Sequence, residues 1–453
     1  MTLKMSTKSP LRLGLLAAGA VAALALPAFA QDAAAPAAEA AAAAPEFASA
    51  AQTAFIFNTL LFLMGGFLVM WMAAGFAMLE AGLVRSKNVS MQCLKNIALY
   101  STAGIMFWVV GYSLMYTDVN GGYFGTPMPY SWPAAGTANE GDYSVASDWF
   151  FQMVFCATTA SIVSGTLAER IKLWPFLIFT VVLTGILYPI TGSWQWGGGW
   201  LSEAGFSDFA GSTLVHSVGG WAALSGALLL GARKGKYTAD GKVIPMPGSS
   251  MPLATLGTFI LWLGWFGFNG ASQLAMGSNG DASDISRIFA NTNLAACGGV
   301  VAAMIVTQIL YKKVDVTMAL NGALAGLVSI TAEPLMPSPL TAIVIGAIGG
   351  IIVVFAVPML DKFKIDDVVG AIPVHLMAGI WGTLIVPFSN PDMSYGTQLM
   401  GIASIGVFTF VTSGILWLVL KSTVGVRASE EQEMMGMDMA EVGVEAYPEF
   451  GKA

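Results

Sequence analysis

The stretch PLTAIVIGAIGGIIVVFAVPML, residues 339–360, contains no charged residue. As an α-helix, about 20 apolar residues are enough to cross the ~30 Å hydrocarbon core of a bilayer. The chain as a whole has the same character, because its 453 residues are 56% hydrophobic and 10% charged, with a mean hydropathy of +0.70. Soluble domains carry roughly 25% charged residues. We therefore predict an all-α polytopic membrane protein, and the composition argues against a water-soluble enzyme.

Ten further apolar stretches accompany this one, which makes eleven predicted transmembrane helices. They lie at about 53–83, 95–117, 147–169, 173–195, 212–231, 251–272, 287–310, 317–333, 339–360, 368–388 and 396–420.

The positions of Lys and Arg support this count. If the first helix runs inward, every Lys and Arg after residue 50 except Arg287 falls on the cytoplasmic side. Cytoplasmic loops of membrane proteins carry such an excess of positive charge. A missed or invented helix would destroy the segregation, so we predict an external N-terminus and a cytoplasmic C-terminus.

Both ends of the chain differ from the membrane part. Residues 1–30 have a basic start, an apolar stretch and the small-x-small site Ala28-Phe29-Ala30, the pattern of a signal peptide cleaved near Gln31. Residues 31–52 form an Ala- and Pro-rich leader, residues 53–421 the transmembrane domain, and residues 422–453 an acidic cytoplasmic tail.

The two histidines of the chain occupy matching places. Val215-His216 with Gly220 lies in the fifth predicted helix, and Val374-His375 with Gly379 lies in the tenth. This short repeated pattern predicts two five-helix halves plus one extra helix. Because five is odd, the halves must be inverted relative to each other, which places a site at the bilayer midplane between them.

Placing a histidine inside a membrane costs free energy, so two histidines at matching positions indicate a functional site. The low dielectric disfavours imidazolium, so we expect both rings to be neutral. A neutral pair can share one N–H···N bond and still offer a donor and an acceptor. Aromatic side chains at the predicted external helix ends could hold a small cation by their ring faces. The pattern favours passage of a small polar molecule or a proton.

Four motifs in this chain resemble the signature of the ammonium transporter family (Amt, Mep and Rhesus proteins), in particular its bacterial Amt type, from about residue 54 to residue 447. The motifs are Leu167-Ala168-Glu169-Arg170, Asp208-Phe209-Ala210-Gly211 before Val215-His216, Gly264-Trp265-Phe266-Gly267-Phe268-Asn269, and Asp366-Asp367 before His375. The resemblance implies an eleven-helix bundle with an inverted five-plus-five repeat, assembled as a homotrimer in the cell inner membrane with one pore per subunit.

The resemblance also implies roles for single residues. Phe151, Phe155, Trp196 and Ser272 correspond to an outer ammonium site, Phe155 and Phe268 to a stacked gate, and His216 and His375 to the pore histidines. Asp208 corresponds to an acidic residue near the entrance, although its position before a helix equally predicts an N-cap.

The chain departs from the family around its second histidine. Gly370 and Leu376 replace an Asp and a Gly of many relatives, and Pro373 lacks a backbone N–H. We therefore expect the pore histidine to keep its role, with altered backbone geometry around it.

The implied function is transport of ammonium, ammonia and methylammonium, without a cofactor or metal and without enzymatic activity. Nucleic acid is not an expected partner, whereas a PII-type signalling protein is expected at the cytoplasmic face, on the loops and the acidic tail. Three alternatives remain on the sequence: an ammonium sensor, a gas channel, or a membrane oxidoreductase with a haem between the histidines.

Overall fold

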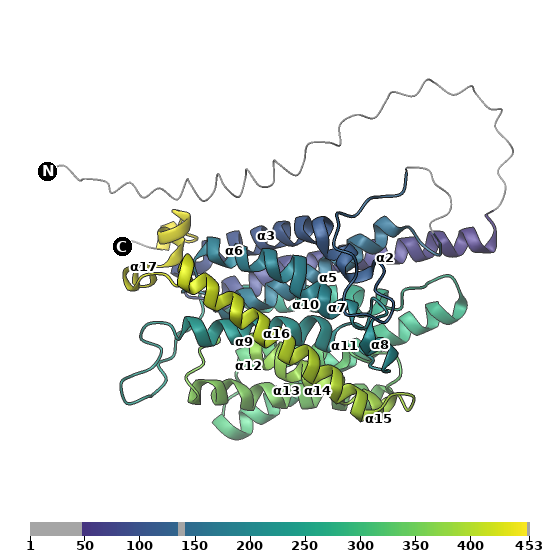
Figure 1. The fold of residues 1–453 in the computed structure, drawn as a ribbon. Coiled ribbons are helices and arrows are strands. Elements are labelled where there is room, and N and C mark those ends of the chain that lie inside the picture. The colour runs from purple at the N-terminus through teal and green to yellow at the C-terminus, as the bar shows by residue number, and fades with distance from the viewer. Residues whose placement is uncertain (1–47, 135–140, 451–453) are drawn as a thin grey trace. The chain divides into compact units, whose positions relative to one another are not determined.

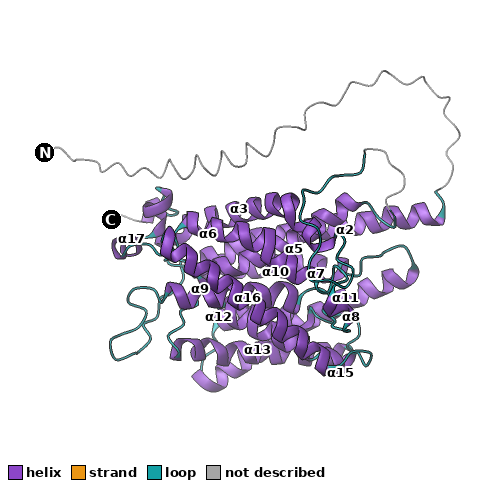
Figure 2. Cartoon of the chain, viewed as in Figure 1, coloured by secondary structure: helices purple, strands orange, loops and turns teal. Residues whose placement is uncertain are grey.

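The computed structural model describes residues 48–134 and 141–450. The predicted signal peptide and its cleavage site lie outside these residues. The described residues form helices and loops, with no strand among them (Figure 2).

The main helices are labelled in Figure 1, and short helical segments continue several of them. In chain order the elements are α2 (Ala50–Leu83), η1 (Ser86–Asn88), α3 (Val89–Met106) with η2 (Phe107–Gly111) and α4 (Tyr112–Tyr116), α5 (Val145–Thr166), α6 (Leu173–Val182) with η3 (Leu183–Leu187) and α7 (Tyr188–Ser193), α8 (Trp200–Glu203), η4 (Ser212–Ser217) with α9 (Val218–Leu230), α10 (Met251–Ala271), α11 (Asn279–Tyr311), α12 (Val316–Ile330), α13 (Pro339–Lys362), η5 (Ile372–Met377) with α14 (Ala378–Leu384) and α15 (Val386–Ser389), α16 (Tyr395–Thr423), α17 (Glu430–Met435), η6 (Asp438–Val442) and η7 (Pro448–Phe450).

Nine helical stretches within the described residues are long and apolar enough to cross a membrane. This confirms a multi-pass helical protein. The remaining two predicted spans coincide with α5 and with the shorter α12, and their crossing of the bilayer stays a prediction, as do the total of eleven spans and the orientation.

Two predicted boundaries were wrong. The helix expected at 287–310 begins at Asn279, because Ser278 and Asp281 form a capping box that adds two turns before the apolar stretch. The helix expected at 95–117 begins at Val89. Lys95, assigned to a cytoplasmic segment, therefore lies inside α3 and is fully buried.

Glycines allow α2 and α10 to pack closely along their length. Gly75 and Gly82 on α2 are spaced by seven residues, as are Gly257 and Gly264 on α10. A Cβ at any of the four would collide with atoms of the other helix. Small residues of this kind are typical of helix contacts inside membranes.

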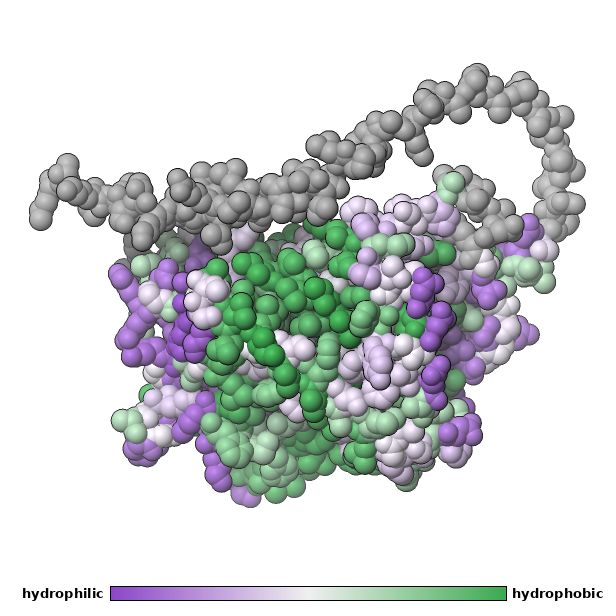
Figure 3. All heavy atoms as spheres, viewed as in Figure 1, coloured by the Kyte–Doolittle hydropathy of each residue, from purple (hydrophilic) through white to green (hydrophobic). Residues whose placement is uncertain are grey.

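On the face seen in Figure 3, apolar residues form a band between two polar ends. On α16, Val407, Val411, Ile415 and Leu418 are exposed on one face of the helix. A soluble monomer rarely exposes so continuous an apolar face, so this band is the surface that lipid or another subunit covers.

Candidate functional site

The four residues predicted for an outer site line one cavity. Phe151 and Phe155 on α5, Trp196 in the loop after α7, and Ser272 at the end of α10 surround a space of about 460 Å³. The Phe155 ring lies 6.1 Å from the Trp196 ring, edge to face. Ser272 Oγ donates to the carbonyl of Phe268 at 2.8 Å, which leaves its oxygen lone pairs as acceptors for a donor in the cavity.

A carboxylate that was not predicted from the sequence lies in the same wall. Asp148, which is 7% exposed, is one turn before Phe151 on α5 and also lines the cavity. Tyr112 Oη donates to it at 2.6 Å, and Gln152 Nε2 donates at 3.2 Å. The sequence did contain a signal for this residue, because Asp148 is an acidic residue in the first turn of an apolar helix, and acidic residues in membrane helices often have a function.

An aromatic plug closes the inner side of the cavity. The rings of Phe155 and Phe268 stack 3.9 Å apart with their planes inclined by 19°. Both side chains are almost completely buried. The predicted gate residues therefore do lie together, and they shut the outer cavity in this conformation.

The two histidines lie directly behind the plug. His216 is 5.3 Å from the ring of Phe268 and stacks on Trp265 at 4.9 Å. Nδ1 of His216 and Nδ1 of His375 are 3.1 Å apart, so one ring donates and the other accepts. His216 Nε2 is buried without a hydrogen-bond partner among the described residues, so its hydrogen-bonding capacity is unused in this conformation.

Matching local structures hold the two rings. His216 lies on η4 and His375 on η5, both of which are π-helical, a form common at functional sites. Five residues before each histidine is a glycine with positive φ, Gly211 at 105° and Gly370 at 81°. Gly370, a departure from the family pattern, thus occupies a position where a left-handed backbone favours glycine.

An aspartate lies before each π-helical segment, and the number of residues between the aspartate and the histidine is the same in both cases. Asp208 accepts four backbone N–H bonds at 2.8–3.0 Å from residues 211–214. Asp367 accepts from Ile372 N at 2.7 Å and from Thr166 Oγ1 at 3.0 Å. Asp208 is fully buried, and its carbonyl also accepts from Trp196 Nε1 at 2.9 Å. Its side chain therefore caps the start of η4 from three residues before the N-cap residue Gly211, and its carbonyl orients one wall of the outer cavity.

The glycines of the repeated pattern lock the two segments together. A Cβ at Gly220 would collide with Leu376 of η5, and a Cβ at Gly379 would collide with the Ser212 carbonyl of η4. Each glycine therefore allows its helix to approach the π-helical segment that carries the other histidine.

Beyond His375 a narrow inner cavity has room for roughly one water-sized molecule. His375, Glu80, Asn321, Val369 and Gly370 are among the residues that line it. The last three also line a wider vestibule of about 420 Å³.

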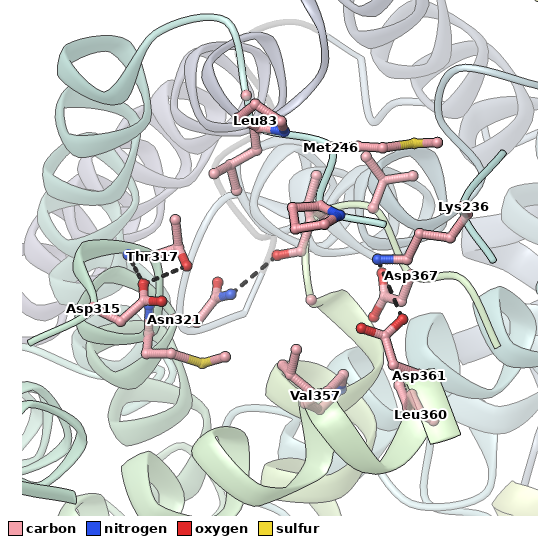
Figure 4. A pocket seen from close by; sticks show the side chains of 18 of the residues that line it. Leu83, Lys236, Met246, Asp315, Thr317, Asn321, Val357, Leu360, Asp361 and Asp367 are labelled. Carbon is pink, nitrogen blue, oxygen red and sulfur yellow. Dashed lines mark hydrogen bonds and ion pairs between the residues drawn. The ribbon is translucent and has the colours of Figure 1, made fainter. Parts of the chain in front are cut away.

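Figure 4 shows this vestibule, with Asn321 on one side and the ion pair of Lys236 and Asp361 on the other. The outer cavity, the plug, the histidines, the inner cavity and the vestibule thus follow one another through the bundle.

The histidine geometry does not fit a haem. Two metal–nitrogen bonds of about 2.0–2.1 Å would separate the nitrogens by about 4 Å, whereas the facing Nδ1 atoms are at hydrogen-bond distance. Within the described residues no cluster of His, Cys, Asp and Glu could hold a metal ion.

Glu169 and Asp366, which belong to two of the sequence motifs, meet at Arg233 beside the vestibule. Arg233 pairs with Asp366 at 2.8 Å and with Glu169 at 3.0 Å, and all three side chains are buried. Burial alone would raise the pKa of Asp366, but the hydrogen bonds from Arg233 and the charge of Arg170 outweigh it and hold that pKa below its usual range.

The acidic tail packs on loops of its own chain at this end of the bundle, which we call the tail end. Glu433 accepts from Arg427 at 2.7 Å and from the backbone of Lys234. Asp438 accepts from Met91 N at 2.8 Å. The described tail is thus an ordered segment rather than a solvated one.

Comparison with known proteins gives consistent matches over most of the chain. Residues 60–447 match the model of the Ammonium Transporter Family. Ammonium transporter Amt2 of Archaeoglobus fulgidus is 42% identical over 416 residues, which cover 85% of this chain and 87% of that one. Ammonium transporter 3 of Dictyostelium discoideum is 32% identical over 403 residues, covering 84% and 91%.

Solved structures agree with these matches. A structure described as a sensor Amt protein superposes with a TM-score of 0.81 at 36% identity, covering 85% of this chain and 98% of that one. Mep2 of Candida albicans superposes with a TM-score of 0.76 at 26% identity, covering 90% and 94%.

Proposed function

The chain belongs to the ammonium transporter family, and from this membership and the pore geometry we propose that it takes up ammonium from the periplasmic side and passes ammonia through the His-lined lumen. The family consists of transporters rather than enzymes. The observation that carries the proposal is the direct succession of a cation-accepting aromatic cavity, a closed phenyl pair and a buried histidine pair.

The outer cavity has the chemistry to distinguish ammonium from potassium. The ring faces of Phe155 and Trp196 attract either cation. Ammonium also donates hydrogen bonds, and Ser272 Oγ is an acceptor on the same wall. Potassium donates no hydrogen bonds, so the ring faces and one serine oxygen offset less of the hydration that it loses. Asp148 adds a carboxylate to the same cavity wall.

The lumen beyond the plug is unsuitable for an ion. His216 and His375 are 0% and 4% exposed, and an unpaired charge in such surroundings costs several kcal/mol or more. Neutral ammonia avoids this cost and can exchange hydrogen bonds with the imidazole rings. We infer that ammonium gives up its proton to water on the outer side of the plug, so that the proton returns to the external solution and ammonia enters the lumen.

Uptake by the purified protein in proteoliposomes tests the proposal. Ammonium and methylammonium should enter, and potassium at the same concentration should not. Transport of potassium at the rate of ammonium, or no transport of either amine, would overturn it.

An ammonium sensor is the second candidate, because one of the similar structures is described as a sensor Amt protein. The same assay separates the two functions. A sensor without transport would bind ammonium at the outer cavity but leave the vesicle contents unchanged.

We further propose eleven spans with the N-terminus outside, so that the tail end faces the cytoplasm. Homotrimer formation would cover part of the apolar band, and a PII-type protein would dock at the tail end. Residues 1–30 would be a signal peptide, and N-terminal sequencing of the membrane-purified protein should begin near Gln31.

A further inference from the structure

A buried carboxylate on α2 borders the inner end of the pore. Glu80 is 1% exposed, and its Oε2 accepts three hydrogen bonds. The donors are Gln92 Nε2 at 2.5 Å, Ser164 Oγ at 2.7 Å and Asn96 Nδ2 at 3.0 Å. These donors fix the orientation of the carboxylate.

The other oxygen of this carboxylate has no hydrogen-bond partner among the described residues. Glu80 Oε1 is buried and unpaired. It faces Gly165, because a Cβ added there would lie 3.5 Å from it. A buried carboxylate oxygen without a donor is unfavourable, so Oε1 is a vacant acceptor that a mobile donor would stabilise.

This acceptor and the second histidine share one cavity. Glu80, Gly165 and His375 line the inner cavity, which joins the vestibule at Asn321 and Gly370. A molecule that moves from His375 through this cavity to the vestibule therefore passes Glu80.

Lys95 balances the charge of the carboxylate. Its side chain is fully buried on α3, and its ammonium group donates to the carbonyl of Ser164 at 2.8 Å. The hydroxyl of Ser164 in turn donates to Glu80. Burial opposes ionisation of this carboxylate, whereas the nearby cation and the three donors favour it. In its ionised form it accepts hydrogen bonds but donates none.

We propose that Glu80 is a substrate-binding residue of the pore, whose Oε1 accepts an N–H hydrogen bond from the nitrogen species leaving His375. This proposal rests on the transport function proposed above. It adds a second binding position on the vestibule side of the histidines, opposite the aromatic cavity. Ammonia fits the chemistry, because it carries three N–H donors and is the size of a water molecule.

Replacement of Glu80 by Gln tests the proposal with little change of shape. The three donors will hold the amide oxygen of E80Q where Oε2 now lies, so the amide NH2 will face the cavity. The acceptor thereby becomes a donor, and we expect ammonium uptake in proteoliposomes to fall about tenfold. The matched control is Glu333→Gln, which removes another buried carboxylate that does not line the inner cavity, and it should transport like the wild type.

Infrared difference spectra with and without ammonium give a readout that a purely structural role would not move. The wild type and E333Q should show an ammonium-dependent change in a carboxylate band, and E80Q should lack that change. If E80Q fails to fold, Glu80→Asp keeps the charge and withdraws the oxygen by one methylene group. It should then show the same loss of flux.

The outcomes separate the two proposals. A wild type that transports ammonium, together with a folded E80Q that transports equally well, overturns the role of Glu80. A wild type that does not transport overturns the proposed function itself.

Discussion

The Nδ1 atoms of His216 and His375 lie 3.1 Å apart, although 159 residues separate the two histidines in the chain. Two imidazolium rings could not meet in this way, because both nitrogens would then be donors. The pair therefore carries at most one shared proton at the contact. This is the arrangement expected for a lumen that admits a neutral hydrogen-bonding molecule.

The outer cavity should depend on the carboxylate of Asp148, which was not predicted from the sequence. Asp148→Asn removes a negative charge from the cavity wall but keeps an acceptor for Tyr112, so ammonium should bind about tenfold more weakly, with little change in maximal flux. Uptake measured against ammonium concentration checks this. The exposed carboxylate of Glu203 on α8 serves as control, and E203Q should leave the affinity unchanged. Equal affinities for D148N and wild type would remove Asp148 from the site.

The tail should be anchored by its buried acids, including Glu433, rather than by its total charge. Glu433 is buried and bonds Arg427 and Lys234, whereas Glu430 pairs with Lys234 at an exposed position. Removing the buried acid of a partly buried pair costs more than the ~0–1 kcal/mol that an exposed pair contributes. Limited proteolysis should therefore release the tail in Glu433→Gln and spare it in Glu430→Gln. Equal cleavage of both variants would contradict this anchoring.

A PII-type partner should need the tail as well as the loops. Deletion of the residues after Arg427 should leave the pore folded, because the predicted spans precede it, while weakening the binding of the partner. Titration of the partner onto full-length and truncated protein measures the difference. Equal binding would place the docking surface wholly in the loops.

Acid should destabilise the tail end through Asp366. Its folded-state pKa is lowered, so its contribution to stability is complete above the unfolded value of about 3.9 and is lost as the pH falls toward the folded value. Thermal unfolding in detergent should show the melting temperature decreasing below about pH 4. Asp366→Asn should be less stable at neutral pH and should lose part of this acid dependence. An unchanged pH profile in D366N would assign the acid sensitivity to other groups.

The residues of the candidate site that belong to a family motif or to the repeated histidine pattern could be predicted from the sequence. Phe155, Phe268, His216 and His375 were expected together and lie together. Ser272 was expected in the outer site and lines that cavity. Their transport roles stay predictions.

The sequence did not reveal contacts between side chains far apart in the chain. Glu80 and Ser164 are separated by 84 residues, and no local pattern indicates that they meet. Lys95 was expected at the cytoplasmic start of a helix because hydropathy alone set that start, whereas the helix begins six residues earlier at Val89. For charged side chains near helix ends, tertiary contacts rather than helix propensity determine whether the side chain is buried.

The central claim is that the histidine pair admits ammonia and excludes ions. Four single variants at matched surface expression test this claim directly. His216→Ala and His375→Ala remove the polar groups behind the intact phenyl plug, and they should lose most ammonium flux. His216→Asp and His375→Asp put an ionisable acceptor into the lumen, and they should admit potassium before their ammonium flux falls. The measurement is the flux of ammonium and of potassium through each variant. Wild-type ammonium flux together with wild-type exclusion of potassium in all four would make the histidines packing residues and leave selectivity to the outer cavity alone.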